Sequence, residues 1–124
     1  MAKILVVDDE EAVRTLLDTV LHRKGHDVVL ASDGQKAIEL FRLERPALTI
    51  LDLKMPGMNG LVVLQKIRAL HPQAPVIILS GAASVADEQQ ARALGVTEFL
   101  QKGFSLHTLG EALNRLLKPS AHQT

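Results

Sequence analysis

The chain has 124 residues, 14 basic and 14 acidic side chains, and a formal net charge of zero. This length fits one domain, and a hydrophobic content of 47% can fill one core without metal or disulfide staples. Because the chain has no cysteine, it forms neither a disulfide framework nor a zinc–thiolate site. Because basic and acidic side chains balance, the protein has no excess of positive charge to attract the phosphates of a nucleic acid or an anionic membrane. We therefore expect no direct nucleic-acid binding and no membrane partner.

The start of the chain is not typical of a signal peptide. The first apolar run, residues 4–7, meets acid at Asp8, which excludes a signal peptide, and no run approaches the roughly 20 apolar residues that span a bilayer. We therefore expect a cytoplasmic protein. One domain is predicted over residues 1–118, and residues 119–124 are typical of a polar tail or the start of a linker.

Short apolar runs alternate with longer segments of helical period. The runs predict five strands: Ile4–Val7, Val28–Ala31, Leu48–Leu51, Val76–Leu79 and Val96–Leu100. Such alternation predicts an α/β fold with a parallel sheet that helices cover on both faces. The first, third and fourth runs are expected at the centre of the sheet, and the second and fifth at its edges.

Five helices are expected between and after these runs. The first ends at Gly25, the second lies between Ser32-Asp33 and Pro46, and the third closes at His71-Pro72. A capping box at Ser84 begins the fourth helix, which ends at Gly95. Its predicted apolar stripe is thin: Val85, Ala86, Ala93 and Leu94. The fifth is capped by Ser105 and buries a leucine face: Leu106, Leu109, Leu113, Leu116 and Leu117.

Polar residues follow the predicted strands at their carboxyl ends. They are Asp8 and Asp9 after the first strand, Asp52 after the third, Ser80 after the fourth and Lys102 after the fifth. A doubly wound sheet of flavodoxin-like order 2-1-3-4-5 places strands one and three side by side, and ligands bind in the crevice there. The three aspartates are therefore expected to converge in one acidic pocket.

Close carboxylates repel one another unless a cation lies among them. Oxygen ligands without histidine or cysteine favour a hard ion, and a site with few protein ligands suits Mg²⁺ better than Ca²⁺. Beside this metal, the ammonium of Lys102 and the hydroxyl of Ser80 suit a phosphoryl group that a carboxylate attacks. The pattern thus predicts a phosphoaspartate site.

Four motifs follow one another along the chain in the order typical of a known family, and the resemblance extends from Lys3 to about Lys118. They are ILVVDDE from Ile4, LDLKMPGMNG from Leu51, VIILSGA from Val76 and FLQK from Phe99. Together they make the chain similar to the receiver domain of bacterial two-component response regulators.

The resemblance implies a role for each site residue. Asp52 would accept a phosphoryl group from a sensor histidine kinase or a histidine phosphotransfer protein. Mg²⁺ would be bound by Asp9, Asp52 and the backbone carbonyl of Lys54, and through water by Asp8. Lys102 and Ser80 would contact the phosphoryl group. Such a protein is not an enzyme in the ordinary sense but a switch that assists its own phosphorylation and dephosphorylation.

The resemblance also implies how the switch is read. Ser80 and Phe99 would reorient on phosphorylation and change the surface of the fourth helix, fifth strand and fifth helix. An output domain, a partner protein or a second copy would bind that surface. The thin apolar stripe of the fourth helix favours such movement, because few buried contacts make repositioning easy.

Gly103 departs from the family pattern, which usually has proline after the lysine. A cis bond before a non-proline residue costs roughly 2.5–4 kcal/mol, so we predict a trans Lys102–Gly103 bond, a less firmly held Lys102 and slow phosphorylation. The alternative is a pseudo-receiver, an interaction module that keeps the fold but does not turn over phosphate.

Other interpretations of single residues remain open at this point. Asp52 also suits an Asx turn, Ser80 a strand-end cap, Lys102 a solvated loop and Phe99 plain core packing. Nucleotide-binding enzymes are disfavoured because the chain lacks both a GxxxxGK[S/T] loop and a GxGxxG motif after the first strand. A flavin carrier is disfavoured because the chain has no tryptophan or tyrosine to stack on the ring.

Overall fold

The computed structural model describes residues 2–55, 57–81, 84–96, 98–103 and 106–117. The five strands are β1 (Lys3–Val7), β2 (Asp27–Ala31), β3 (Leu48–Asp52), β4 (Val76–Ser80) and β5 (Glu98–Gln101). The helices are α1 (Glu11–Arg23), α2 (Gly34–Glu44), α3 (Gly60–Leu70), α4 (Val85–Ala93) and α5 (Leu106–Leu117). All strand pairs are parallel and the sheet order is β2-β1-β3-β4-β5, which confirms the predicted doubly wound fold.

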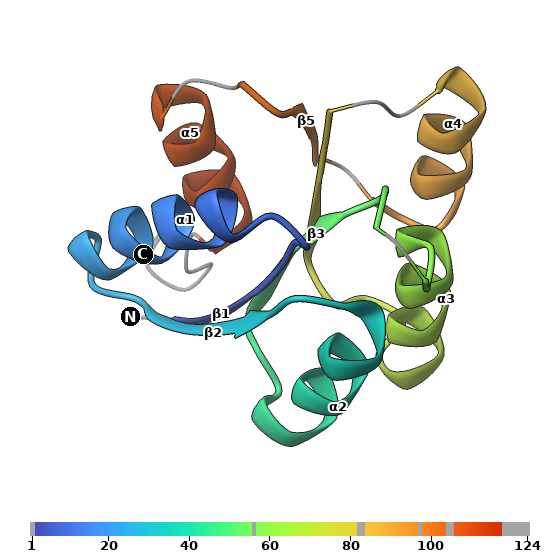
Figure 1. Cartoon of the computed structure of the whole chain (residues 1–124), viewed down its shortest axis with the longest axis horizontal. Helices are drawn as coiled ribbons and strands as arrows, with labels where there is room; N and C mark the ends of the chain where they lie inside the picture. The colour runs from blue at the N-terminus through green and yellow to red at the C-terminus, as the bar shows by residue number, and fades with distance from the viewer. Residues whose placement is uncertain (1, 56, 82–83, 97, 104–105, 118–124) are drawn as a thin grey trace, which may run out of the picture.

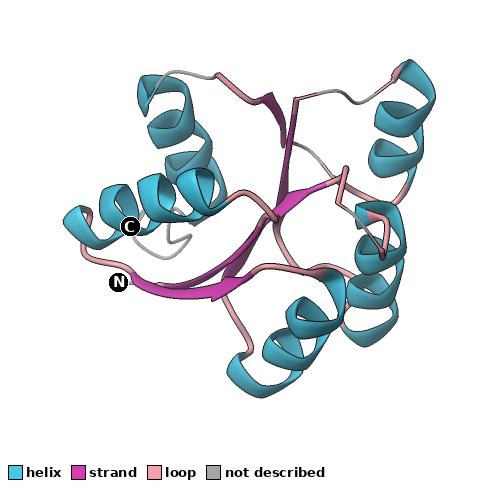
Figure 2. Ribbon diagram, in the orientation of Figure 1, coloured by secondary structure: helices cyan, strands magenta, loops and turns pink. Residues whose placement is uncertain are grey.

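The helices cover both faces of the sheet. α1 and α5 lie on one face, and α2, α3 and α4 lie on the other (Figure 1). Strands occupy the middle of the molecule with helices on either side (Figure 2). β3 and β4 are buried along their whole length, whereas β2 and β5 are partly exposed, as expected for central and edge strands.

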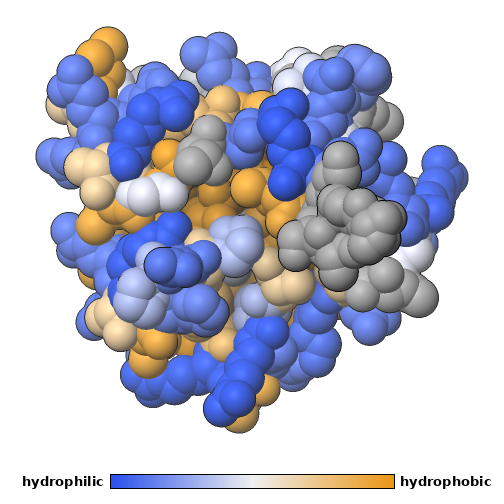
Figure 3. Space-filling model, turned by 180° about the vertical axis from the view of Figure 1, so that it is seen from behind, coloured by the Kyte–Doolittle hydropathy of each residue, from blue (hydrophilic) through white to orange (hydrophobic). Residues whose placement is uncertain are grey.

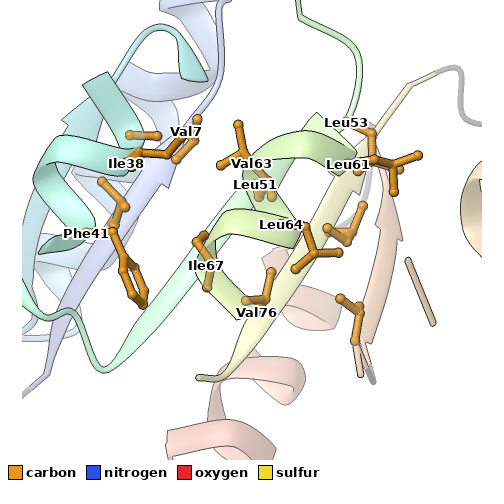
Figure 4. Packing of buried hydrophobic residues seen from close by; sticks show 14 of the residues in the cluster. Val7, Ile38, Phe41, Leu51, Leu53, Leu61, Val63, Leu64, Ile67 and Val76 are labelled. Atoms are coloured by element: carbon orange, nitrogen blue, oxygen red, sulfur yellow. The ribbon is translucent and has the colours of Figure 1, made fainter. Parts of the chain in front are cut away.

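Two hydrophobic layers hold this arrangement together. The layer under α2 and α3 includes Leu51, Val63 and Ile67, whose side chains lie beside one another between α3 and the sheet (Figure 4). The opposite layer joins α1 and α5 to the sheet through Leu17, Leu21 and other apolar side chains. Each strand contributes alternate residues to the two layers, because successive side chains point to opposite faces.

The predicted helix boundaries are confirmed closely. Asp33 caps α2 by accepting a hydrogen bond from the Lys36 amide, and Asn59 caps α3 through the Leu61 amide. Ser84 and Asp87 form the predicted capping box of α4, with each side chain bonded to the other residue's amide. The predicted Ser105 cap and the tail at 119–124 lie outside the described residues.

The predicted apolar stripe of α4 is wrong. Val85, Ala86 and Ala93 are exposed, and only Leu94 of that set is partly buried. The one fully buried residue of the helix is Ala91. At 100° per residue, Ala91 lies far around the helix from Val85 and Ala93, so α4 turns its apolar residues outward.

α5 buries the described part of the face that the leucine spacing predicts, and the side chain of Leu106 lies outside what the structure describes. Leu109 and Leu113 are buried with Ala112, and Leu116 and Leu117 are partly buried against the same layer. β5 begins at Glu98, later than the predicted run, although Val96 before it is buried.

No helix among the described residues is long and apolar enough to cross a membrane. The longest, α1, has 13 residues and spans roughly 20 Å at 1.5 Å per residue, against a hydrocarbon core of about 30 Å. Seen from behind, hydrophilic side chains border the hydrophobic residues visible at the centre of that face (Figure 3).

Candidate functional site

Three aspartates meet at the carboxyl ends of β1 and β3, as the sequence predicts. Asp8 and Asp9 follow β1, and Asp52 is the last residue of β3. One carboxylate oxygen from each lies within 4.8 Å of the others. Asp8 and Asp52 are each only 1% exposed, whereas Asp9 is exposed, so the site is a buried pair of carboxylates with a third at its mouth.

Backbone hydrogen bonds fix the two buried carboxylates. The Glu10 amide donates to Asp8 Oδ1 over 2.8 Å, and the Lys54 amide donates to Asp52 Oδ1 over 3.1 Å. The Arg14 guanidinium donates to the Asp8 carbonyl oxygen over 2.7 Å, which ties the loop after β1 to α1. Each carboxylate therefore keeps its second oxygen, Oδ2, for other partners.

Lys102 supplies the positive charge of the site. Its Nζ lies 3.1 Å from Asp52 Oδ2 and 3.3 Å from Asp8 Oδ2, and it also pairs with Glu10. The Lys102 amide donates to the Ser80 carbonyl oxygen over 3.0 Å, which holds the loop after β5 against the end of β4. Three carboxylates contact one ammonium, and whether Gly103 leaves Lys102 less firmly held stays a prediction.

The electrostatics of the site follow from burial. Desolvation raises the pKa of Asp8 and of Asp52 above the ordinary aspartate value, although the backbone bonds and Lys102 oppose the rise. Desolvation disfavours the charge on Lys102 too, but the hydrogen bonds to Glu10 and Asp52 and the nearby carboxylate charges outweigh it and raise its pKa. Without a further cation, the acidic pocket holds more negative charge than Lys102 alone offsets.

A hard divalent cation fits this pocket. Asp8 Oδ2 is buried and has no hydrogen-bond partner among the described residues, although the Lys102 ammonium is nearby. A buried oxygen without a hydrogen bond is costly, and a cation that accepts it as a ligand removes that cost. All three candidate ligand side chains are carboxylates, which suit Mg²⁺. Coordination by the Lys54 carbonyl stays a prediction.

Ser80 lies at the end of β4, and Phe99 lies on the neighbouring strand β5. Ser80 ends β4, is 1% exposed and pairs in register with Gln101, next to Lys102. Phe99 is half-buried and packs against the layer under α2, α3 and α4. The Arg92 guanidinium of α4 lies 5.9 Å from the centre of its ring. Phe99 therefore contacts α4 as a switch residue should, and its reorientation stays a prediction.

The backbone conformation at position 103 explains why a glycine lies there. Its φ is +90°, in the left-handed region, and the described residues contain no cis peptide bond, so the predicted trans Lys102–Gly103 bond is confirmed. Proline fixes φ near −65°, so it fits this position only if the loop takes another path. Glycine thus supports a loop geometry that differs from that of a lysine–proline sequence.

The sequence analysis assigned no role to two residues that shape the site. Glu10 pairs with Lys102 across 92 positions of the chain, a contact that only the fold creates. Gly60 packs so closely under β3 that an added Cβ would lie 2.3 Å from the Asp52 carbonyl oxygen. The Gly60 amide also donates to the Leu53 carbonyl oxygen over 3.0 Å. A glycine at the first position of α3 was the available signal.

The response regulator receiver domain family matches residues 4–114. The chain belongs to this family. The chain is 38% identical over 122 residues to a probable transcriptional regulator, ycf27, of Cyanophora paradoxa. It is 31% identical over 115 residues to sporulation initiation phosphotransferase F of Bacillus subtilis, and covers 93% of it.

Solved structures agree with this assignment. The chemotaxis protein CheY4 of Vibrio cholerae superposes with a TM-score of 0.87 at 31% identity, covering 94% of this chain and 98% of that one. The chain spans about half the length of several curated relatives, including 51% of the Cyanophora regulator and 49% of the regulator PhoP of Bacillus subtilis. The match is therefore to the receiver domain of these longer proteins.

Proposed function

We propose that Asp52 accepts a phosphoryl group in a Mg²⁺-dependent reaction, and that a sensor histidine kinase or a histidine phosphotransfer protein donates it. The observation that carries this proposal is the buried Asp52 carboxylate with Oδ2 3.1 Å from the Lys102 ammonium and the carboxylates of Asp8 and Asp9 beside it. Membership of the receiver family supports the same role.

The transfer is one substitution at phosphorus. An Asp52 carboxylate oxygen forms a new bond to phosphorus while the bond from phosphorus to the donor breaks, and the donor leaves with that electron pair. With acetyl phosphate as donor, the leaving group is acetate and the product is an aspartyl phosphate. The chain acts as an acceptor that becomes modified, rather than as an enzyme that releases a product at each turnover.

The residues of this chain orient and neutralise the group. Lys102 lies where its ammonium can pair with a phosphoryl oxygen, and Ser80 is the neighbouring hydroxyl at the end of β4. Asp52 is fixed by the Lys54 amide, so its free oxygen is already directed towards Lys102. When bound, Mg²⁺ would supply charge neutralisation for the phosphoryl oxygens, held by Asp9, Asp52 and the Lys54 carbonyl and, through water, by Asp8.

Phosphorylation would be read at the surface of α4, β5 and α5. Phe99 and Arg92 connect β5 to α4, and Lys102 follows β5 directly, so a change at the phosphoryl site reaches this surface through few residues. An output domain, a partner protein or a second copy would bind there. Several relatives are transcriptional regulators about twice as long as this chain, which favours an output domain.

A pseudo-receiver that binds partners without phosphorylation is the second candidate. The observation that favours it is Gly103, whose φ of +90° gives the loop after Lys102 a path that proline cannot follow. The two candidates differ in one measurable property, the gain of a phosphoryl group.

Intact mass spectrometry after treatment with acetyl phosphate and Mg²⁺ separates them. The parent should gain the mass of one phosphoryl group, and Asp52→Asn should gain none while folding normally. Asp18→Asn, which changes an exposed carboxylate on α1, is the matched control and should behave as the parent. A parent without added mass, or a modified Asp52→Asn variant, would contradict phosphorylation at Asp52.

A further inference from the structure

α4 is held to the rest of the molecule mainly by polar contacts at its two ends. Ala91 is its one fully buried residue. At its start, the Asp87 carboxylate pairs with Lys54 Nζ over 3.0 Å. At its end, the Leu94 carbonyl oxygen accepts a hydrogen bond from the Arg68 guanidinium of α3. α4 therefore has little apolar packing of its own, and these two polar contacts join its ends to neighbouring elements.

The two contacts differ in how readily they can change. Arg68 is partly buried and also donates to the Ala74 carbonyl oxygen over 2.7 Å, so it links α3, the segment before β4 and the end of α4. Lys54 is 49% exposed and its ammonium is bonded to Asp87 alone among the described residues. The start of α4 is thus the end with the more easily exchanged contact.

Lys54 also touches the phosphoacceptor. Its amide donates to Asp52 Oδ1, two residues before it, while its side chain reaches Asp87. One residue therefore joins the acceptor carboxylate to the first turn of α4. The pair with Lys54 is the main cause that lowers the pKa of Asp87, followed by the capping bond from Ser84, so Asp87 is a carboxylate at neutral pH.

We propose that Lys54 is a cation shared between Asp87 and the phosphoryl group. While Asp52 is unmodified, Lys54 holds the first turn of α4 through Asp87, and when Asp52 carries a phosphoryl group Lys54 turns to that group and releases the turn. The second half of this inference rests on the proposed function, and the first half does not.

The charges favour this exchange. A phosphoryl group carries between −1.5 and −2 charges near pH 7 and three acceptor oxygens, against one charge on Asp87. The lysine ammonium sits on a flexible four-carbon stem with three rotatable donors, so it can turn without movement of its backbone. Because an exposed ion pair contributes little to stability, Asp87 loses Lys54 without unfolding of the domain.

The tether is tested first in the unmodified protein by amide hydrogen exchange. The Glu88 amide, which donates to the Ser84 carbonyl oxygen over 3.0 Å, reports opening of the first turn. Lys54→Gln removes the pair and keeps the Ser84 cap, so Glu88 should exchange about two- to fivefold faster. Asp87→Asn should have the same effect, and the double variant should add nothing further.

Glu44→Gln is the control, because it breaks another lysine–carboxylate pair, with Lys3, that does not involve α4. It should leave the exchange of Glu88 unchanged. If Lys54→Gln exchanges like the parent, or if the two substitutions accelerate exchange independently, the tether is contradicted.

The exchange of partners is then tested with Mg²⁺ and beryllofluoride, a stable mimic of the phosphoryl group, with fluorine NMR to show that it binds. In the parent, the mimic should quicken Glu88 exchange towards the rate of Lys54→Gln, and in that variant it should have little further effect. A bound mimic that leaves the parent rate unchanged would overturn the exchange. Failure of the mimic to bind at all would refute the proposed function, and with it the exchange, while the tether result in unmodified protein stands.

Discussion

α3 and α4 lie on the same face of the sheet but are attached in different ways. α3 buries Leu61, Val63, Leu64 and Ile67 against the sheet and brings Gly60 into contact with the backbone of β3. α4 buries only Ala91 and relies on contacts with Lys54 and Arg68 at its ends. α3, which follows the strand that carries Asp52, is thus anchored by apolar packing, and α4 by polar contacts at its ends.

This difference assigns the two helices to different tasks. Apolar packing loses stability whenever it shifts, because interiors are close-packed and have few alternative arrangements. Exposed polar contacts exchange partners at low cost, so a helix held by them can take more than one position. We therefore expect α3 to keep Asp52 in place and α4 to be the helix that responds to phosphorylation.

Truncating one leucine in α3 and one at the end of α4 should show most strongly that the two helices are anchored differently. Leu64→Ala in α3 should destabilise the domain by about 2–5 kcal/mol, since Leu64 is fully buried and its loss leaves a cavity. Leu94→Ala at the end of α4 should cost less than about 2 kcal/mol, because Leu94 is only partly buried. Urea unfolding of both variants measures the difference, and equal losses would contradict the contrast.

Metal binding at the three aspartates should stabilise the whole folded domain. At a Mg²⁺ concentration one hundred times its dissociation constant, a site present only in the folded protein adds about 2.7 kcal/mol. Asp9→Ala should abolish the rise in melting temperature, and Asp27→Ala, which removes an exposed carboxylate at the start of β2, should not. Equal responses of both variants to Mg²⁺ would place the metal elsewhere.

Gly60 tests whether α3 positions the phosphoacceptor. An added Cβ would lie 2.3 Å from the Asp52 carbonyl oxygen and 2.5 Å from Leu53 Cα, so the Gly60→Ala variant must shift the end of β3 or the start of α3. We expect a loss of about 1–3 kcal/mol and slower phosphorylation of Asp52.

Gly110→Ala in α5 is the control for Gly60→Ala. Its added Cβ would come no closer than 3.6 Å to another atom, the Lys24 ammonium, and alanine is the better helix former. It should therefore be neutral or stabilising. Calorimetry and intact mass measured on both variants check the two expectations, and a stable Gly60→Ala variant with parental phosphorylation would refute the positioning role.

The smallest expected effect concerns β5, the edge strand beside α4. Glu98 accepts two hydrogen bonds from Arg115 of α5, over 2.7 and 2.9 Å, and these bonds lower the pKa of Glu98. A lowered carboxyl pKa stabilises the folded state above the ordinary glutamate value of about 4.5, and this contribution is lost as pH falls through the folded pKa.

Glu98→Gln should therefore be slightly less stable than the parent at pH 7 and equal to it in acid. Urea unfolding of both proteins at pH 7 and below the lowered pKa provides the check. A difference that stays constant across this range would show that the loss comes from packing rather than from the charge of Glu98.

The fold could be predicted from the sequence because its signals are local. Apolar runs located the central strands within a residue, and the Ser84-Asp87 capping box located the start of α4. The convergence of Asp8 and Asp52 also followed, since parallel strands bring their carboxyl ends to one edge.

What could not be predicted depends on contacts between distant residues. The pairing of Lys102 with Glu10 and of Lys54 with Asp87 exists only once the strands and helices are assembled. The prediction of which face of α4 is buried was wrong for the same reason. Val85 was expected inside but is 73% exposed, because contacts at the two ends of the helix set its rotation. The spacing of apolar residues along the chain does not reveal such contacts.

Amide exchange of α3 and α4 in one sample, before and after addition of Mg²⁺ and beryllofluoride, tests the division of tasks most directly. We predict that amides of α3, such as that of Ile67, exchange slowly in both states, and that the response is confined to α4 and its neighbours β5 and α5. A response of equal size in α3, or one restricted to α1, would contradict the claim that a fixed α3 supports the acceptor while α4 reports its state.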